Sequence, residues 1–165
     1  MTAYAQRSVL VDTNIVSAEF IPRRNNAVLR ARYAAHLAGV EWVVSFVTVA
    51  ELRFGALVAN WGPQRIDAME ARLRQLRVIG VTSDLAWQCA QMRVECRRAG
   101  AAIADKHHEA DRWIAASALK HGLPLISNDK IFGAVPGLTH VYEPEQVTPT
   151  LAAVPFTQSS TTQTP

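Results

Sequence analysis

The 165-residue sequence lacks several features that mark particular protein classes. Its only two cysteines, Cys89 and Cys96, lie seven positions apart in a helical pattern. That spacing places them on one face of a helix but about 10 Å apart along its axis, too far for a disulfide bond. No uninterrupted apolar stretch reaches the ~20 residues of a membrane span, and the first residues do not form a signal peptide. We therefore expect a protein of the reducing cytoplasm without membrane contact.

The sequence also lacks the short motifs of common nucleotide and zinc sites. Neither GxxxxGK[ST], the pattern of a phosphate-binding loop, nor GxGxxG, the pattern of a dinucleotide fold, occurs. The two cysteines follow the apolar face of a predicted helix, and His107 and His108 have no partner at zinc-ligand spacing. These absences argue against nucleotide-loop and zinc chemistry.

Lysine is scarce, occurring only at Lys106, Lys120 and Lys130. The formal net charge is nevertheless +3 and the pI is near 9.2, so arginine supplies nearly all of the positive charge. Arginine suits bidentate contacts with phosphate. The composition therefore permits a nucleic-acid partner without selecting one.

Length and composition predict one domain followed by a tail. A chain of 165 residues with 49% hydrophobic residues can bury a core of its own. Residues 146–165 contain no charged side chain and are rich in Thr, Ser and Pro. Such a segment does not form a packed core. We expect a domain over residues 1–145 and a flexible tail over residues 146–165.

Short buried strands alternate with helices along the domain. Apolar and β-branched runs predict strands at residues 9–11, 41–46, 77–81, 125–126 and 139–142. Helices are predicted over 27–37, after Thr48, from Pro63, after Thr82, and from the region of Asp111. This alternation is typical of an α/β fold, in which helices cover both faces of a parallel sheet.

Four acids fall where this fold places its ligands. Asp12 and Asp129 follow predicted strands, whereas Glu51 and Asp111 are expected in the first turns of helices. The ten helical steps from Asp111 to His121 rise about 15 Å, and the returning strand covers a similar distance. Because ligands bind at the carboxyl ends of parallel strands, we expect all four carboxylates to share that edge of the sheet.

Clustered carboxylates repel one another and need protons or a cation. Oxygen ligands select hard divalent ions such as Mg²⁺ or Mn²⁺, which also accept phosphate oxygens. Taken alone, these acids also have structural explanations that involve no metal ion. Asp12 can cap a helix, Glu51 can form a capping box with Thr48, and Asp111 suits a helix dipole. Their joint position favours a metal site for phosphate chemistry.

Three blocks of sequence resemble a known family. They are LVDTNIVSAEF at 10–20, SFVTVAELRFGA at 45–56 and ADRWIAASALKHGLPLISNDKIF at 110–132. In their order and spacing these blocks resemble the motifs of PIN-domain ribonucleases, in particular VapC-type toxins of type II toxin–antitoxin pairs. The resemblance extends roughly from Val9 to Tyr142. It implies a PIN-like three-layer sandwich with a four- to five-stranded, mostly parallel sheet.

The resemblance also implies roles for individual residues. Its catalytic and metal-binding acids correspond to Asp12, Glu51, Asp111 and the more variable Asp129. Its phosphate-contacting or supporting polar residues correspond to Thr13, Asn14 and Ser127, where Ser127 replaces the usual threonine and keeps the hydroxyl. Arg53, Arg112 and Lys130 are the nearest cations in sequence that could grip neighbouring phosphates.

The function implied by the resemblance is a Mg²⁺-dependent endoribonuclease, with Mn²⁺ as a possible substitute. Water activated by a metal in the acid cluster would cleave an RNA phosphodiester. The implied partners are RNA, a cognate antitoxin that occludes the acidic pocket, and a second copy of the chain in a homodimer. The connector ADKHHEAD at 104–111 and the uncharged tail depart from the family pattern.

Two other functions stay open at the level of sequence. A phosphotransfer domain could use Asp12 as its nucleophile, but it would need a lysine at the same edge, where Lys130 is the nearest candidate. A catalytically inactive PIN-like module could keep the fold only to bind a partner, although the intact acids argue against it. Metal-dependent RNA cleavage that is lost in an Asp12→Asn variant would separate the three.

Overall fold

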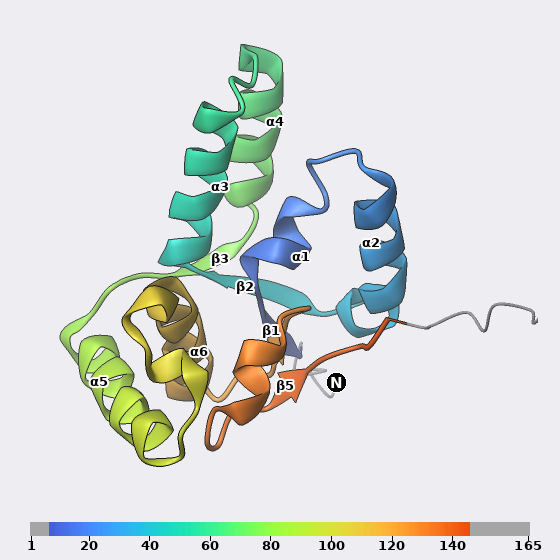
Figure 1. The fold of residues 1–165 in the computed structure, drawn as a ribbon. Coiled ribbons are helices and arrows are strands. Elements are labelled where there is room, and N and C mark those ends of the chain that lie inside the picture. Colours follow the sequence, from blue (N-terminus) through green and yellow to red (C-terminus); the bar gives the residue numbers. More distant parts are fainter. Residues whose placement is uncertain (1–6, 146–165) are drawn as a thin grey trace, which may run out of the picture.

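The computed structural model describes residues 7–145 as an α/β fold around one parallel sheet (Figure 1). The sheet has five strands in the order β3-β2-β1-β4-β5, and every neighbouring pair is parallel. The strands are β1 Ser8–Val11, β2 Glu41–Ser45, β3 Arg77–Ile79, β4 Leu125–Ile126 and β5 His140–Val141. The predicted α/β class and the five strands are confirmed. The predicted tail over 146–165 lies outside the described residues.

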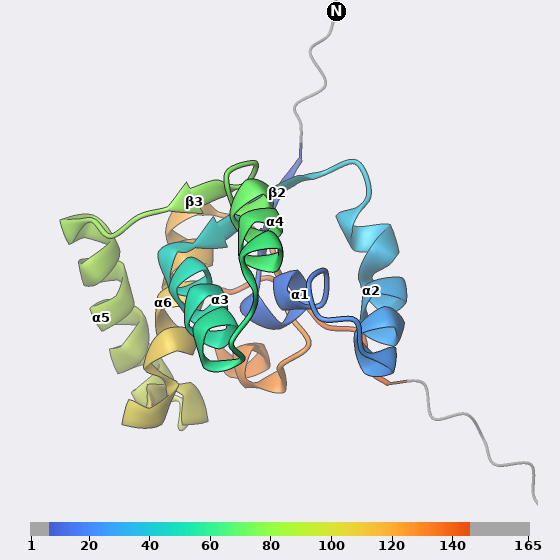
Figure 2. The same cartoon turned by 90° about the horizontal axis from the view of Figure 1, so that it is seen from above.

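Helices cover both faces of this sheet (Figures 1 and 2). They are α1 Thr13–Ser17, α2 Arg24–Leu37, α3 Phe46–Val58, α4 Pro63–Leu73, α5 Ser83–Arg98 and α6 Glu109–His121. Short 3-10 turns add η1 Ala102–Ala104, η2 Lys106–His108 and η3 Lys130–Ala134. Within residues 7–145, no helix has the length and apolar character needed to cross a bilayer.

Side chains of the central strand β1 point alternately to the two faces of the sheet, and the hydrophobic core therefore has two parts. Leu10 packs on the face covered by α5 and α6, whereas Val9 and Val11 pack on the face covered by α1, α2, α3 and α4. Successive strand residues point to opposite faces, so a strand buried on both sides is apolar throughout. The result is the predicted three-layer sandwich of helices, sheet and helices.

The register of β1 brings distant residues together at the carboxyl edge. Val11 pairs with Ile126 of β4, and the Asp12 backbone N–H donates to the Ile126 carbonyl at 3.0 Å. Asp12 and Ser127 are the next residues along these two strands. They therefore lie beside each other although 115 positions separate them in sequence.

Two predicted helix starts are wrong. Helix α2 begins at Arg24, three residues before the predicted start. Helix α3 is capped by Ser45, whose hydroxyl accepts from the Val47 N–H at 3.4 Å, and not by Thr48, which is fully buried inside the helix. Strand β2 runs into α3 without a loop, so the cap comes from the last strand residue. The capping box that was the alternative explanation for Glu51 is therefore absent.

Candidate active site

Asp12 is a buried acid at the centre of the carboxyl edge. Its side chain caps α1, with Oδ1 accepting from the Thr13 N–H at 2.7 Å and Oδ2 accepting from the Ser127 hydroxyl at 2.6 Å. The pKa of Asp12 is raised from 3.8 to about 6, mainly by burial and to a smaller extent by the charges of Asp111 and Glu51, while the two hydrogen bonds lower it. The three predicted acids therefore act on one another.

Thr13 joins Glu51 to this centre. Glu51 is exposed on α3, and its Oε2 accepts a hydrogen bond from the Thr13 hydroxyl. The hydroxyl of Thr48 lies 3.1 Å from that of Thr13. Because a carboxylate only accepts, Thr13 donates to Glu51 and is free to accept from Thr48. Glu51 thus joins α3 to α1 and does not form the capping box that was its alternative explanation.

Packing of α6 against the start of α3 positions Asp111. The rings of Trp113 and Phe46 meet edge to face with centroids 5.7 Å apart. Beneath them, the buried hydroxyls of Ser117 and Ser45 lie 3.4 Å apart. These contacts bring the first turn of α6 to the end of β2. Asp111 is in that turn, as predicted.

Asp111 has a partner that the sequence analysis missed. Its Oδ2 lies 2.9 Å from Nδ1 of His108, three residues earlier in the chain. His108 has no partner at zinc-ligand spacing, but a carboxylate three residues further along lies within reach across a helical turn. That spacing is the signal that could have identified it.

Asp129 stands apart from the other acids. Its carboxylate is exposed and caps η3 by accepting from the Ile131 N–H at 2.9 Å. Its charge is not among those that shift the pKa of Asp12. Asp129 follows β4 at the predicted edge, but a role as the fourth ligand stays a prediction.

Ser127 connects the predicted polar residues. Its buried hydroxyl donates to Asp12, and it also accepts from the Asp129 N–H at 3.0 Å and from Asn14 Nδ2 at 3.5 Å. The Asn14 Oδ1 is buried and has no hydrogen-bond partner among the described residues. A buried amide oxygen without a donor, close to a cluster of acids, is chemically suited to face a cation or a water molecule.

The donor chemistry suits a divalent ion, but the side chains are not gathered around a common point. Carboxylates and an amide oxygen are hard ligands of the kind that Mg²⁺ prefers. Within residues 7–145, no three His, Cys, Asp or Glu side chains lie close enough together to hold an ion. Each acid instead bonds to a donor of the protein itself. Each carboxylate oxygen has two lone pairs, so a hydrogen-bonded acid can still offer a lone pair to a cation.

The cations expected to grip phosphates are mostly engaged elsewhere. Arg112 is buried, and its guanidinium donates to the carbonyls of Ile103 and Asp105, so the prediction for Arg112 is wrong. Arg53 forms a bidentate pair with Glu70 at 2.7 and 2.9 Å on the exposed surface between α3 and α4. Lys130 is exposed, and its ammonium lies 5.9 Å from the ring centroid of Tyr142.

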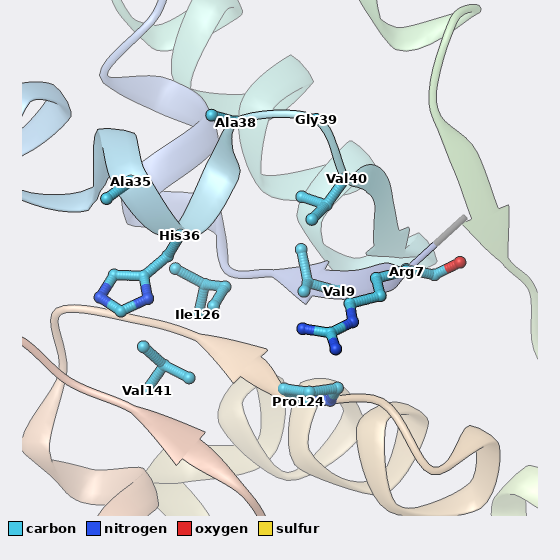
Figure 3. Close-up of a pocket in the computed structure, with 11 residues that line it drawn as sticks. Arg7, Val9, Ala35, His36, Ala38, Gly39, Val40, Pro124, Ile126 and Val141 are labelled. Carbon is cyan, nitrogen blue, oxygen red and sulfur yellow. The ribbon is translucent and has the colours of Figure 1, made fainter. Parts of the chain in front are cut away.

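A larger cavity lies away from the acids. It measures about 1150 Å³ and opens at the amino ends of β1 and β4, where Arg7 and His36 lie at opposite ends of a floor that includes Val9 and Ile126 (Figure 3). A smaller groove of about 400 Å³ borders Thr13 and Glu51. The larger cavity and the acids therefore lie in different places, and the buried Asp12 with its raised pKa identifies the carboxyl edge as the candidate site.

A family model described as "PIN domain" matches residues 9–138, which covers the whole of this edge. The chain belongs to the PIN-domain family. It is 32% identical over 105 residues to ribonuclease VapC4 of Mycobacterium tuberculosis, a match that covers 60% of this chain and 75% of VapC4. It is 30% identical over 128 residues to toxin FitB of Neisseria gonorrhoeae, covering 73% of this chain and 87% of FitB.

A solved structure agrees with these relatives. A toxin–antitoxin complex from Klebsiella pneumoniae is similar with a TM-score of 0.58 and 25% identity, and the match covers 79% of this chain and 94% of the matched chain. The PIN-domain chain thus belongs with the VapC and FitB toxin ribonucleases. Ribonucleases of the family generally depend on a divalent metal ion.

Proposed function

We propose that this PIN-domain chain is a Mg²⁺-dependent endoribonuclease and the toxin of a toxin–antitoxin pair. The observation that carries the proposal is the buried carboxyl of Asp12, whose pKa is raised to about 6 in the company of Asp111 and Glu51. A fold gains nothing in stability from burying a charge beside two others, so such a group suggests a functional site. Family membership supplies the reaction class.

Each residue has a task in this proposal. When bound, Mg²⁺, or Mn²⁺ in its place, supplies Lewis-acid activation of water and neutralises charge on the phosphate. Asp12, Asp111 and Glu51 hold the ion, and Asp129 at the same edge orients water or a second ion. Ser127 and Thr13 keep Asp12 and Glu51 in place through their hydroxyls. Asn14 contacts Ser127 through Nδ2, and its buried Oδ1 has no hydrogen-bond partner among the described residues.

The antitoxin is proposed to occupy the groove of about 400 Å³ between α1, α3 and α4. Thr13 and Glu51 form one end of this groove, and Leu52, Ala56 and Trp61 supply apolar lining. A partner segment seated there would block the approach of RNA to the acids. The similarity to a chain of a toxin–antitoxin complex supports an antitoxin partner, and the groove's border with Thr13 and Glu51 is the reason for placing it there.

A second copy of the chain is proposed to cover an exposed apolar surface next to the edge strand β3. Val78, Val81 and Trp87 are 44%, 60% and 68% exposed, which is unusual for large apolar side chains so close in sequence. An edge strand with apolar neighbours favours pairing with another chain. We therefore retain the homodimer, and we place its action on RNA in the cytoplasm.

The test of the nuclease is cleavage of single-stranded RNA with Mg²⁺ and with EDTA. We expect cleavage only with Mg²⁺ and a loss of at least about 100-fold in Asp12→Asn, because this change removes the most buried acid of the cluster. His36→Ala, on α2 and paired with the partly exposed Glu143, is the control and should cut like the wild type. Cleavage that survives in Asp12→Asn would show a contaminating nuclease.

The same samples test the two alternatives. A phosphotransfer protein would label itself from a phosphoryl donor and lose the label in Asp12→Asn. An inactive module would bind RNA or the antitoxin but would not cleave RNA in the presence of any metal ion. Asp12 is 5% exposed and both its oxygens are hydrogen-bonded, which disfavours a role as phosphate acceptor.

A further inference from the structure

The connector before α6 is held rigidly, although its sequence departs from the family pattern. Ile103 is fully buried in the core. The guanidinium of Arg112 is buried beneath the connector and donates to the Ile103 carbonyl at 3.0 Å and to the Asp105 carbonyl. Arg93 of α5 donates to the Ala104 carbonyl at 3.0 Å. Two arginines therefore fix the backbone that leads to His108.

His108 ends this connector and faces the first turn of α6. It occupies the position just before the helix, with φ −100° and ψ 35°. Its Nδ1 lies 2.9 Å from Asp111 Oδ2, and the two side chains are 35% and 28% exposed. Because a carboxylate accepts, the hydrogen on Nδ1 points to Asp111. The bond uses one oxygen of the acid and sets the orientation of the other.

The other two acids of the cluster have comparable holders. Ser127 donates to Asp12, and Thr13 donates to Glu51. Both holders are part of the sequence blocks that resemble the family, whereas His108 lies in the connector. Carboxylates that bind metal ions are themselves hydrogen-bonded in general, and the bond reduces the freedom lost on binding. Asp111 gains such a bond from a residue specific to this connector.

We propose that His108 is a positioning residue that holds the Asp111 carboxylate for a divalent cation. This inference rests on the proposed metal-dependent function. It assigns His108 no contact with RNA or with the ion. Its role is to keep Asp111 in one orientation beside Asp12, so that the cluster binds the cation more tightly.

The test measures Mn²⁺ binding by calorimetry with the full chain at pH 7.5. We expect His108→Ala to weaken binding about tenfold, the lower end of what loss of a supporting hydrogen bond causes. His108→Asn should restore affinity to within about threefold, since the Asn Nδ2–H occupies the place of Nδ1–H. His108→Gln carries its amide one methylene further out and should behave like Ala. His107→Ala, an exposed neighbour of the same type, should bind like the wild type.

Wild-type affinity in His108→Ala would overturn the proposal. So would equal weakening in the Ala, Asn and Gln variants with a lower melting temperature in EDTA, because that result describes damage to the connector. RNA cleavage is a separate readout. If Mn²⁺ binding depends on His108 but no RNA is cut, the nuclease proposal fails and this inference stands. If RNA is cut in the presence of metal and His108→Ala binds Mn²⁺ as tightly as the wild type, this inference fails and the nuclease proposal stands.

Discussion

The two edges of the sheet are built from the same strands but differ in character. At the amino edge a cavity of about 1150 Å³ lies between α2 and strands β1 and β4, lined largely by apolar side chains such as Val9 and Ile126 (Figure 3). At the carboxyl edge Asp12 and Ser127 are buried and bonded to each other. In this fold the buried charge of Asp12, and not the size of a cavity, indicates where the candidate active site lies.

The connections explain the difference. At the carboxyl edge, β1 and β2 continue into α1 and α3 after one residue or none, so polar residues at the strand ends are buried at once. At the amino edge, the Ser8 hydroxyl and the Glu41 carboxylate bond to each other in a partly buried position. These short connections place the mutually repelling acids together at the carboxyl edge of the sheet.

The largest expected effect is a gain in stability on removing the central charge. The folded-state pKa of Asp12 is raised from 3.8 to about 6, so its carboxylate destabilises the metal-free fold fully above pH 6 and not below about pH 4. Asp12→Asn should therefore raise the free energy of unfolding at pH 7.5 by roughly 2–3 kcal/mol and leave it unchanged near pH 4. Urea denaturation in EDTA at both pH values measures this. A variant less stable than wild type at pH 7.5 would contradict the assigned burial.

A smaller effect is expected at Ser127. Ser127→Ala removes the donor that lowers the pKa of Asp12, so that pKa should rise above about 6. Loss of a hydrogen bond to a buried carboxylate should reduce the free energy of unfolding at pH 7.5 by about 1–2 kcal/mol. Carboxyl NMR titration and urea denaturation report the two quantities. Ser127→Thr keeps the hydroxyl and is the control; equal losses in both variants would indicate altered packing instead.

The smallest effect is expected at the contact between α2 and the segment that follows β5. His36 Nε2 pairs with Glu143 Oε1 at 2.6 Å, and both side chains are more than a third exposed. His36→Ala should lower the free energy of unfolding by less than about 1 kcal/mol, with no change in RNA cleavage. Thermal denaturation and the cleavage assay provide the measurement. A large loss of cleavage in His36→Ala would mean that this surface contact, and not the carboxyl edge alone, supports the reaction.

The fold, and the expectation that Asp12, Glu51 and Asp111 lie near the carboxyl edge, follow from local signals. Apolar runs identify β1 and β4, and the Gly122 turn, with φ 61°, brings the chain back from α6. The start of α3 could not be predicted in the same way, because Ser45 and Thr48 are both good caps and only the end of β2 selects between them. Sequence alone likewise predicts a surface position for Arg112, because its buried hydrogen bonds to the Ile103 and Asp105 carbonyls depend on the fold.

The sequence by itself determined the order of strands and helices and the chemical type of the site, because periodicity and the order of residue types are local properties. Tertiary structure alone decided that Ser127 holds Asp12 across 115 positions, that Thr13 holds Glu51, and that Asp129 turns to cap η3. Those outcomes depend on strand register and helix packing. Both arise from burial summed over the whole core, which no short stretch of sequence contains.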